Sequence, residues 1–385
     1  MENDFLPFSR PTISEEAIDE VVECLRSGWI TTGPRVKQFT EMLKEYLHSP
    51  FVLPLSSATA GLHLSLLALD LKSGDEVITT PMTFAATANC IIHAGAKPVF
   101  VDVDPNTFNI DIDLVAKAIT PNTKAVIPVH FAGLSVDCDP LYALAKKHQL
   151  HIIEDAAHAI GSEYKGKRIG SFGHTHVYSF HPNKNMTTGE GGCVSTFDEA
   201  LAEKIALLRF HGMDREAWNR YGKSGKQDYE IVLPGYKYNM MDIQAAIGIH
   251  QLPKLDSFIE RRSQIANRYI EELKDWPELF LPQPPNYEQK HAWHIFTPLI
   301  NHENAGMNRA EFMEAMKQEN IGTGLHYRAL HLYPYYQEQF GYQHGDFPHA
   351  EKISERIVSL PLFPTMTDEE QTRVIDTMKK IFNKV

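Results

Sequence analysis

The chain has 385 residues, of which 43% are hydrophobic and 22% are charged, a composition typical of a soluble globular protein with enough chain for two domains. Its formal net charge of −12 argues against a nucleic-acid-binding surface, which needs a stripe of lysine and arginine to displace counterions from phosphates. An anionic small-molecule substrate would need only a local basic patch.

The cysteines and the amino-terminal segment predict the compartment. Four cysteines are dispersed along the chain without a CxxC pair or zinc-ligand spacing, so we expect buried free thiols in a reducing cytoplasm: Cys24, Cys90, Cys138 and Cys193. The opening residues MENDFLPFSRP have neither the basic nor the apolar segment of an export signal. No apolar run is long enough to span a bilayer. We therefore expect a cytoplasmic protein without membrane insertion.

Residues 14 to 27 predict an amphipathic helix, with Ser14 as its N-cap and apolar residues at helical spacing. The helix ends at a glycine, and residues 29 to 34 form a turn. Thr31 and Thr32 in this turn could hydrogen-bond a sugar or cap the next helix. From these residues alone, capping is the safer interpretation.

Short apolar strands alternate with helical stretches from residue 51 onward. Such Val/Ile-rich runs predict an α/β fold with a mostly parallel sheet that helices cover on both faces. The seven expected strands are residues 51–55, 76–80, 98–103, 124–129, 151–155, 176–180 and 193–196. We expect this sheet to form a large domain.

The first two strands lead into residues suited to a ligand. Small and hydroxyl residues at 56–61 precede a helix at 60–69, where free N–H groups and the helix dipole favour an anion. Capping and phosphate binding explain this stretch about equally well when it is taken alone. The next strand ends near Phe84; a phenylalanine in a loop is more often part of the core than a cofactor contact.

Asp155 and Lys184, taken together, change the interpretation of the residues that follow the first two strands. Asp155 ends a buried strand, where open α/β sheets place ligands. Lys184 lies on a hairpin-like loop between the last two strands, where a lysine is usually a solvated cation. A pyridoxal phosphate site needs one lysine to form the Schiff base and one carboxylate to keep the pyridine nitrogen protonated. The pair makes phosphate binding the preferred interpretation of residues 56–61.

Two features near this pair have alternative interpretations. His158 follows Asp155 by three residues and could contact the ring hydroxyl of the cofactor or be a satisfied helix histidine, with equal weight. The glycine-rich turn from Gly189 to Gly192 could give the backbone room beside the cofactor or close a hairpin.

The rest of the chain predicts a smaller α+β domain. Its expected elements are a charged helix at 254–276, strand-like segments at 291–300 and 322–327, a helix at 308–320 and a final helix that opens with the capping box Thr367 to Glu370. We expect domains at 1–253 and 254–385. His326 and Tyr327 end the second strand-like segment and Arg328 follows it. These residues could line a substrate cleft, although surface solvation explains Arg328 equally simply.

Two other site classes lack their motifs. Of nineteen histidines, none falls into HExxH or a facial triad, so we expect no metal. A nicotinamide-dependent oxidoreductase would carry G-x-G-x-x-G between a strand and a helix, and no such fingerprint or Walker A sequence is present.

The chain resembles the DegT/DnrJ/EryC1/StrS family of pyridoxal-phosphate aminotransferases that act on nucleotide-linked keto-sugars, from FLPFSRP at residue 5 to SLPLFP ending at 364. The stretches that carry the resemblance are GWITTGP (28–34), SSATAGLH (56–63), TFAATAN (83–89), IEDAAHAIGSEYKG (153–166), SFHPNKNMTTGEGG (179–192) and PGYKYNMMDIQAAIG (234–248). Through HAWH and IGTGLHYRA it is most similar to the UDP-4-amino-4-deoxy-L-arabinose aminotransferase branch.

The resemblance implies fold type I of the pyridoxal-phosphate enzymes, a homodimer with composite sites, and glutamate as amino donor. Lys184 would be catalytic, Asp155 would bind the pyridine nitrogen, and the aromatic ring of Phe84 would cover the cofactor. The phosphate ligands would be Thr59, Ala60 and Ser179. The turn with Thr31 and Thr32 would face the substrate.

One motif departs from the family pattern. Many relatives carry G-[FY]-N-x-R, whose asparagine reaches the cofactor phosphate of the partner subunit. This chain has GYKYN at 235–239, so Lys237 or Asn239 would have to substitute.

The predicted reaction is amino transfer from glutamate to the C4 keto group of a nucleotide sugar. The preferred substrate is a UDP-4-keto-pentose, which would give UDP-4-amino-4-deoxy-L-arabinose, and the alternative is a UDP- or dTDP-4-keto-6-deoxyhexose for a surface glycan. Sugar dehydratases of the family carry histidine at the lysine position, so Lys184 favours transamination. A non-catalytic regulatory protein that keeps the cofactor is the alternative of another class, against which the intact Asp155 and Lys184 argue.

Overall fold

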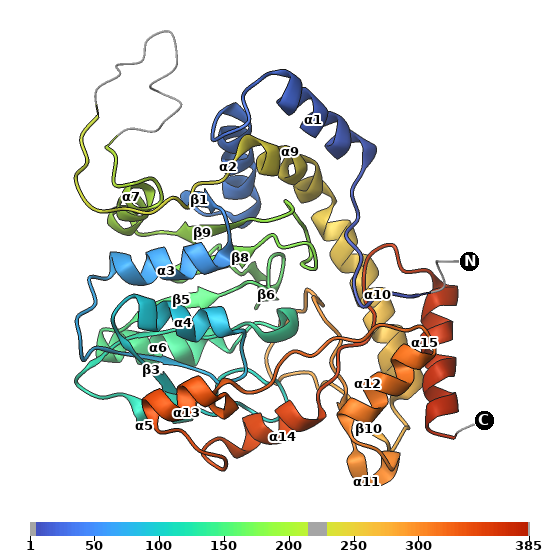
Figure 1. The fold of residues 1–385 in the computed structure, drawn as a ribbon. Coiled ribbons are helices and arrows are strands. Elements are labelled where there is room, and N and C mark those ends of the chain that lie inside the picture. Colours follow the sequence, from blue (N-terminus) through green and yellow to red (C-terminus); the bar gives the residue numbers. More distant parts are fainter. Residues whose placement is uncertain (1–4, 215–228, 384–385) are drawn as a thin grey trace.

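A seven-stranded sheet in the order β1-β9-β8-β5-β4-β2-β3 forms the centre of the computed structural model, which describes residues 5–214 and 229–383 (Figure 1). Its strands are Phe51–Leu55 (β1), Glu76–Thr79 (β2), Lys97–Phe100 (β3), Thr123–Val126 (β4), His151–Asp155 (β5), Thr175–Ser179 (β8) and Gly192–Thr196 (β9). Only β9 runs antiparallel to its two neighbours in this sheet; β3, β2, β4, β5 and β8 pair in parallel. The predicted α/β fold is confirmed.

Neighbouring residues of the central strands enter two different cores, because successive side chains of a strand point to opposite faces of the sheet. On β5, Ile152 packs in the core with α2, α5, α6 and α9. The next residue, Ile153, packs in the core with α3, α4 and α7. Helices therefore cover both faces, which explains why the strands read as continuous apolar runs. These helices are Pro34–Leu47 (α2), Ala58–Ala68 (α3), Ala85–His93 (α4), Ile112–Ala118 (α5), Cys138–His148 (α6), Glu199–Leu208 (α7) and Asp242–Gln251 (α9).

The amino-terminal segment joins two distant parts of the chain. Leu6 pairs with Ile321 and is buried in a core made largely by α10, α12 and α15. The first helix, Glu15–Arg26 (α1), then packs against α9, as Figure 1 shows. The carboxyl-terminal helices are Leu255–Leu273 (α10), His302–Ala305 (α11), Arg309–Gln318 (α12), Pro334–Phe340 (α13), Pro348–Arg356 (α14) and Asp368–Ile381 (α15). The predicted capping box at Thr367 and Glu370 is present.

The two strand-like segments predicted in the second region are wrong as continuous strands. Outside the seven-stranded sheet, each strand of the described residues is two residues long: Glu163–Tyr164 (β6), Lys167–Arg168 (β7), Leu279–Phe280 (β10), Gln289–Lys290 (β11) and Leu299–Ile300 (β12). Residues 291–300 and 322–327 otherwise form isolated bridges, such as Phe296 with Leu360 and Gly324 with Ser359. Pro298 lies inside the first segment and has no N–H to donate to a ladder. The first segment is largely buried, whereas residues 322–327 are half-buried or exposed, and neither segment pairs along its length.

All four cysteines are free and buried, as predicted. Among the described residues, none of the helices combines the length and the apolar character needed to cross a membrane.

Candidate active site

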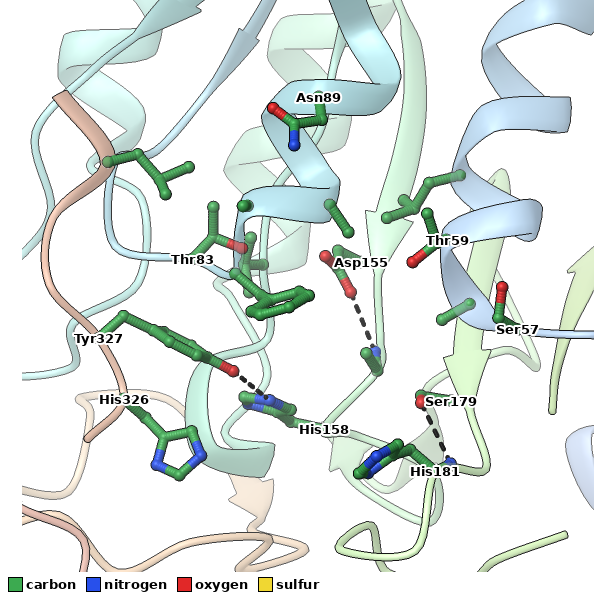
Figure 2. Close-up of a pocket in the computed structure, with 18 of the residues that line it drawn as sticks. Ser57, Thr59, Thr83, Asn89, Asp155, His158, Ser179, His181, His326 and Tyr327 are labelled. Carbon is green, nitrogen blue, oxygen red and sulfur yellow. Dashed lines mark hydrogen bonds between the residues drawn. The ribbon is translucent and has the colours of Figure 1, made fainter. Parts of the chain in front are cut away.

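A cavity of about 910 Å³ lies where β5 and β8 end and α3 begins (Figure 2). Parallel strands that end at one edge of a sheet bring their following residues together there, so residues distant in sequence line one cavity. Eight of the residues proposed from the sequence line it: Thr59, Phe84, Asp155, His158, Ser179, Lys184, His326 and Tyr327. Arg328 lines it as well.

Asp155 is buried at the carboxyl end of β5, with 5% of its surface exposed. One carboxylate oxygen accepts a hydrogen bond from the Thr87 hydroxyl at 2.7 Å, and the other accepts one from the Ala157 main-chain N–H at 3.2 Å. Burial raises the pKa of Asp155, while these hydrogen bonds and the charge of Lys184 oppose the rise. A buried carboxylate that retains free acceptor positions suits a cationic ring nitrogen.

Lys184 lies on the loop between β8 and β9 and is half-buried. Its main-chain N–H donates to the His181 carbonyl at 2.9 Å, and its Nζ lies 3.4 Å from Nε2 of His294. Burial lowers the pKa of Lys184 to about 8, and the charge of Asp155 opposes this shift. The amine therefore loses its proton more readily than the solvated lysine that is usual on a loop, which suits a nucleophile.

The amino terminus of α3 forms the third part of the site. Ser57 is the N-cap and accepts a hydrogen bond from the Ala60 N–H at 3.1 Å, while Thr59 faces the cavity (Figure 2). Ala60 itself is buried and does not line the cavity. Gly192 of β9 lies against this turn: a Cβ there would be 2.6 Å from the Ala58 nitrogen and 2.5 Å from the Tyr178 oxygen. The glycine allows this close approach, and the amino terminus of α3 favours an anion.

His158 is positioned by two hydrogen bonds. Its Nδ1 accepts from the Ala132 N–H at 3.3 Å, so its proton is on Nε2, which lies 3.0 Å from the Tyr327 hydroxyl. Figure 2 shows this pair beside His326. The alternative that His158 is a helix histidine is wrong, because residues 157 and 158 form a turn. Phe84 is the N-cap residue of α4 and is 62% exposed, with its ring 6.2 Å from the Tyr327 ring.

The other four proposed residues lie outside this cavity. Thr31 is exposed, and Asn239 donates from Nδ2 to the Thr32 hydroxyl at 2.6 Å. Lys237 Nζ bonds the Asn239 side-chain oxygen. The single chain therefore gathers Thr32, Lys237 and Asn239 in a cluster of their own, which we call the 239 cluster.

The expectation that Thr31 or Thr32 caps the next helix is wrong. Gly33 is the N-cap residue of α2, and the carboxylate of Asp242 accepts hydrogen bonds from the free N–H groups at Gly33, Arg35 and Val36, at 2.8, 3.1 and 3.0 Å. A carboxylate at a helix amino terminus satisfies these donors and the helix dipole together. The two threonines are thereby left for other contacts.

Sequence reasoning missed several residues of the site. Thr87 bonds Asp155, and His294 contacts Lys184 across 110 positions of the chain. Asn89 also lines the cavity and accepts a hydrogen bond from the Tyr336 hydroxyl at 2.7 Å. Thr87 and Asn89 lie in the first half of α4, which follows β2 after a loop that lines the cavity, and this position was a usable signal. His294 had none, because no local pattern predicts that its segment reaches the loop of Lys184.

The side chains present fit pyridoxal phosphate. A nucleophilic lysine, a buried carboxylate and a helix amino terminus that binds anions open into one cavity, and these match the carbonyl, the ring nitrogen and the phosphate of that cofactor.

Comparison with known proteins identifies the family. Residues 11–379 match the model of the DegT/DnrJ/EryC1/StrS aminotransferase family. The chain belongs to this family. It is 47% identical to the spore coat polysaccharide biosynthesis protein SpsC of Bacillus subtilis, over 98% of this chain and 97% of that protein.

Solved structures agree with this assignment. The sugar aminotransferase Spr1654 of Streptococcus pneumoniae in its pyridoxal-phosphate form, named as putative, is 34% identical and superposes with a TM-score of 0.90 over 99% of both chains. Helicobacter pylori PseC, an aminotransferase involved in the biosynthesis of pseudoaminic acid, is 31% identical, with a TM-score of 0.91 over 99% of this chain and 100% of that chain. This member of the DegT family is therefore a pyridoxal-phosphate-dependent aminotransferase, which confirms the predicted fold type, enzyme class and cofactor.

Proposed function

We propose that the enzyme transfers the amino group of glutamate to the C4 keto group of a nucleotide-linked sugar, with Lys184 as the catalytic residue. The observation that carries the proposal is the arrangement of Lys184 and Asp155, which open into one cavity of about 910 Å³ beside the amino terminus of α3. This volume accommodates a cofactor together with a sugar substrate.

Bound pyridoxal phosphate supplies an electron sink that stabilises negative charge at the α-carbon of the amino donor. Lys184 would hold the cofactor through its Nζ, and when it is not attached its Nζ would take the proton from the donor α-carbon. Asp155 remains ionised beside the ring nitrogen, whose positive charge offsets the cost of burying the carboxylate. The N–H groups and hydroxyls at Ser57 and Thr59, with Ser179, hold the phosphate. The second half of the cycle uses Lys184 in the opposite direction.

Two sugars are candidates for the acceptor. The likeness of the HAWH and IGTGLHYRA segments to the arabinose branch supports a UDP-4-keto-pentose. The roles of SpsC in spore coat polysaccharide biosynthesis and of PseC in pseudoaminic acid biosynthesis support the 4-keto-6-deoxyhexose of a surface glycan. The active-site chemistry is the same in both cases.

Amination of a sugar panel tests this function. The purified enzyme is incubated with glutamate and UDP- or dTDP-linked 4-keto-pentose and 4-keto-6-deoxyhexoses, and mass spectrometry follows the conversion of carbonyl to amine. We expect amination of at least one of these sugars, and the preferred sugar decides between the two candidates. Absence of amination with every sugar would contradict the proposal.

We also propose that the active site is completed by a second copy of the chain. The 239 cluster lies outside the cavity, yet it stands on the segment whose family counterpart contacts the phosphate of the partner subunit. Apolar side chains are exposed on and near α1 and α9, with Leu25 at 54%, Ile30 at 46% and Met241 at 43%. Exposed apolar residues that gather in one region favour a protein interface, and a two-fold dimer would bring the 239 cluster of each chain towards the other cavity.

Complementation between two inactive variants tests this arrangement. We expect Lys184→Ala and the double variant Lys237→Ala/Asn239→Ala each to be impaired, and their co-expression to restore about a quarter of native activity, because half of the randomly paired dimers then hold one intact site of two. Amination rates of the co-purified dimers provide the measurement. Full activity of the double variant, or no rescue on co-expression, would contradict the shared site.

A further inference from the structure

The side chain of His294 contacts the amine of Lys184. It is 1% exposed, and its Nε2 lies 3.4 Å from Lys184 Nζ. Its ring also lies against that of His158, with the centroids 4.3 Å apart. The cofactor chemistry described above gives no role to His294, although it contacts the reactive amine.

The main chain fixes this imidazole in place. The His294 N–H donates to the Ala132 carbonyl at 2.9 Å, and Arg262 donates from Nη1 to the carbonyls of Trp293 and His294 at 3.3 and 3.1 Å. Arg262 is itself 1% exposed. The main chain at His294 is therefore fixed both by the Ala132 carbonyl and by the buried guanidinium of Arg262.

The loop of Lys184 is tied to the same segment. Asn185, the residue after the lysine, donates from Nδ2 to the Ala292 carbonyl at 2.7 Å. Because this bond and the contact at Lys184 join the same two segments, the lysine and the imidazole keep their separation when the lysine is not attached to a cofactor.

The hydrogen bonds of His294 determine its tautomer. Its Nδ1 is buried and has no hydrogen-bond partner among the described residues. A buried N–H without an acceptor is rarer and more costly than a lone pair without a donor, so the proton belongs on Nε2. That N–H points at Lys184. A free amine has a lone pair that can accept this hydrogen bond, whereas an ammonium has none, so the contact favours the free amine of Lys184.

We propose that His294 is a positioning residue that holds the free amine of Lys184 through an Nε2–H hydrogen bond whenever the lysine is not covalently attached. This role rests on the proposed function of Lys184 as the attachment point and proton carrier. It favours the unprotonated form of the lysine and aims the amine into the cavity between its two tasks, so that more returns to the reacting carbon start from a competent base.

The charges around His294 agree with a neutral imidazole. The groups that face it are Lys184 on the loop after β8, His158 after β5, Arg262 on α10 and His326. Burial first, and these groups next, lower the pKa of His294 well below its usual value. A protonated imidazole beside Lys184 and Arg262 would place three cations together.

Trace acetylation of the enzyme freed of cofactor tests the role without relying on catalysis. The protein is labelled with acetic anhydride from about pH 6 to pH 11, and the peptide with Lys184 is quantified by mass spectrometry. The native chain should show a midpoint near the pKa of about 8. His294→Gln should raise the midpoint by about one pH unit, a tenfold change in the protonation equilibrium, because the amide oxygen can accept from an ammonium.

The matched control is His291→Gln, which makes the same substitution three residues away in a ring that stacks on Trp293 at 3.8 Å and lines a different cavity. His291→Gln should leave the midpoint unchanged. If His294→Gln does not fold, as judged by circular dichroism, His294→Phe keeps a ring but has no N–H to donate and should shift the midpoint in the same direction.

An unshifted midpoint in the His294 variants, an equal shift in His291→Gln, or a native midpoint near 10.5 would each overturn the role. Sugar amination is measured in the same native preparation. Amination with an unshifted midpoint therefore refutes only the role of His294, whereas absence of amination refutes the proposed function.

Discussion

Lys184→Ala should abolish amino transfer, with a fall in the amination rate of at least about 10⁴-fold. The amine is both the attachment point and the group that moves the proton, and the described cavity lining contains no second lysine that could replace it. The variant should still fold, because the replaced side chain is half-buried in a cavity and not in the core. Steady-state product formation, followed by mass spectrometry, provides the measurement.

The control is Lys146→Ala, which removes an exposed lysine on α6. This variant should aminate the sugar at the native rate. Appreciable transamination by Lys184→Ala would remove Lys184 from its catalytic role, whatever the cofactor content of the variant.

Asp155→Asn should lower the amination rate by about a hundredfold or more and weaken cofactor retention. The amide keeps the shape of the carboxylate but loses the charge that holds the ring nitrogen protonated, and it must donate towards Thr87 or Ala157, which both donate to Asp155 in the native chain. Asp155→Ala should be more severe and remain folded. The amination rate and the cofactor that survives dialysis are the two measurements.

Asp139→Asn is the matched control, because Asp139 is an exposed acid that pairs with Lys165 on the surface and should be neutral for catalysis. Native kinetics and native cofactor retention in Asp155→Asn would remove Asp155 from the site.

The sequence was most informative where a local pattern decides the structure. The seven strands follow from apolar runs between helical stretches, and their ends differ from the prediction by a few residues. Asp155 and Ser179 could be placed at the cavity because each ends a strand of the sheet. Lys184 was placed on its loop by the strands on either side, although its partial burial was not predictable from the loop itself.

The remaining features depend on contacts between distant segments. Residues 291–300 are largely buried, and a buried extended segment gives a signal that resembles that of a strand. The capping of α2 by Asp242 joins residues more than 200 positions apart, so the nearby threonines were the natural but wrong choice. The contact of His294 with Lys184 arises in the same way.

Borohydride reduction of the native enzyme with bound pyridoxal phosphate, followed by peptide mapping, tests the central claim most directly. Reduction fixes the cofactor to the nitrogen that holds it, so mass spectrometry can locate the attachment point. We expect the pyridoxyl group on the peptide that contains Lys184 and nowhere else in the native chain, and no labelled peptide in Lys184→Ala. A pyridoxyl group on another lysine, with the Lys184 peptide unmodified, would contradict the account.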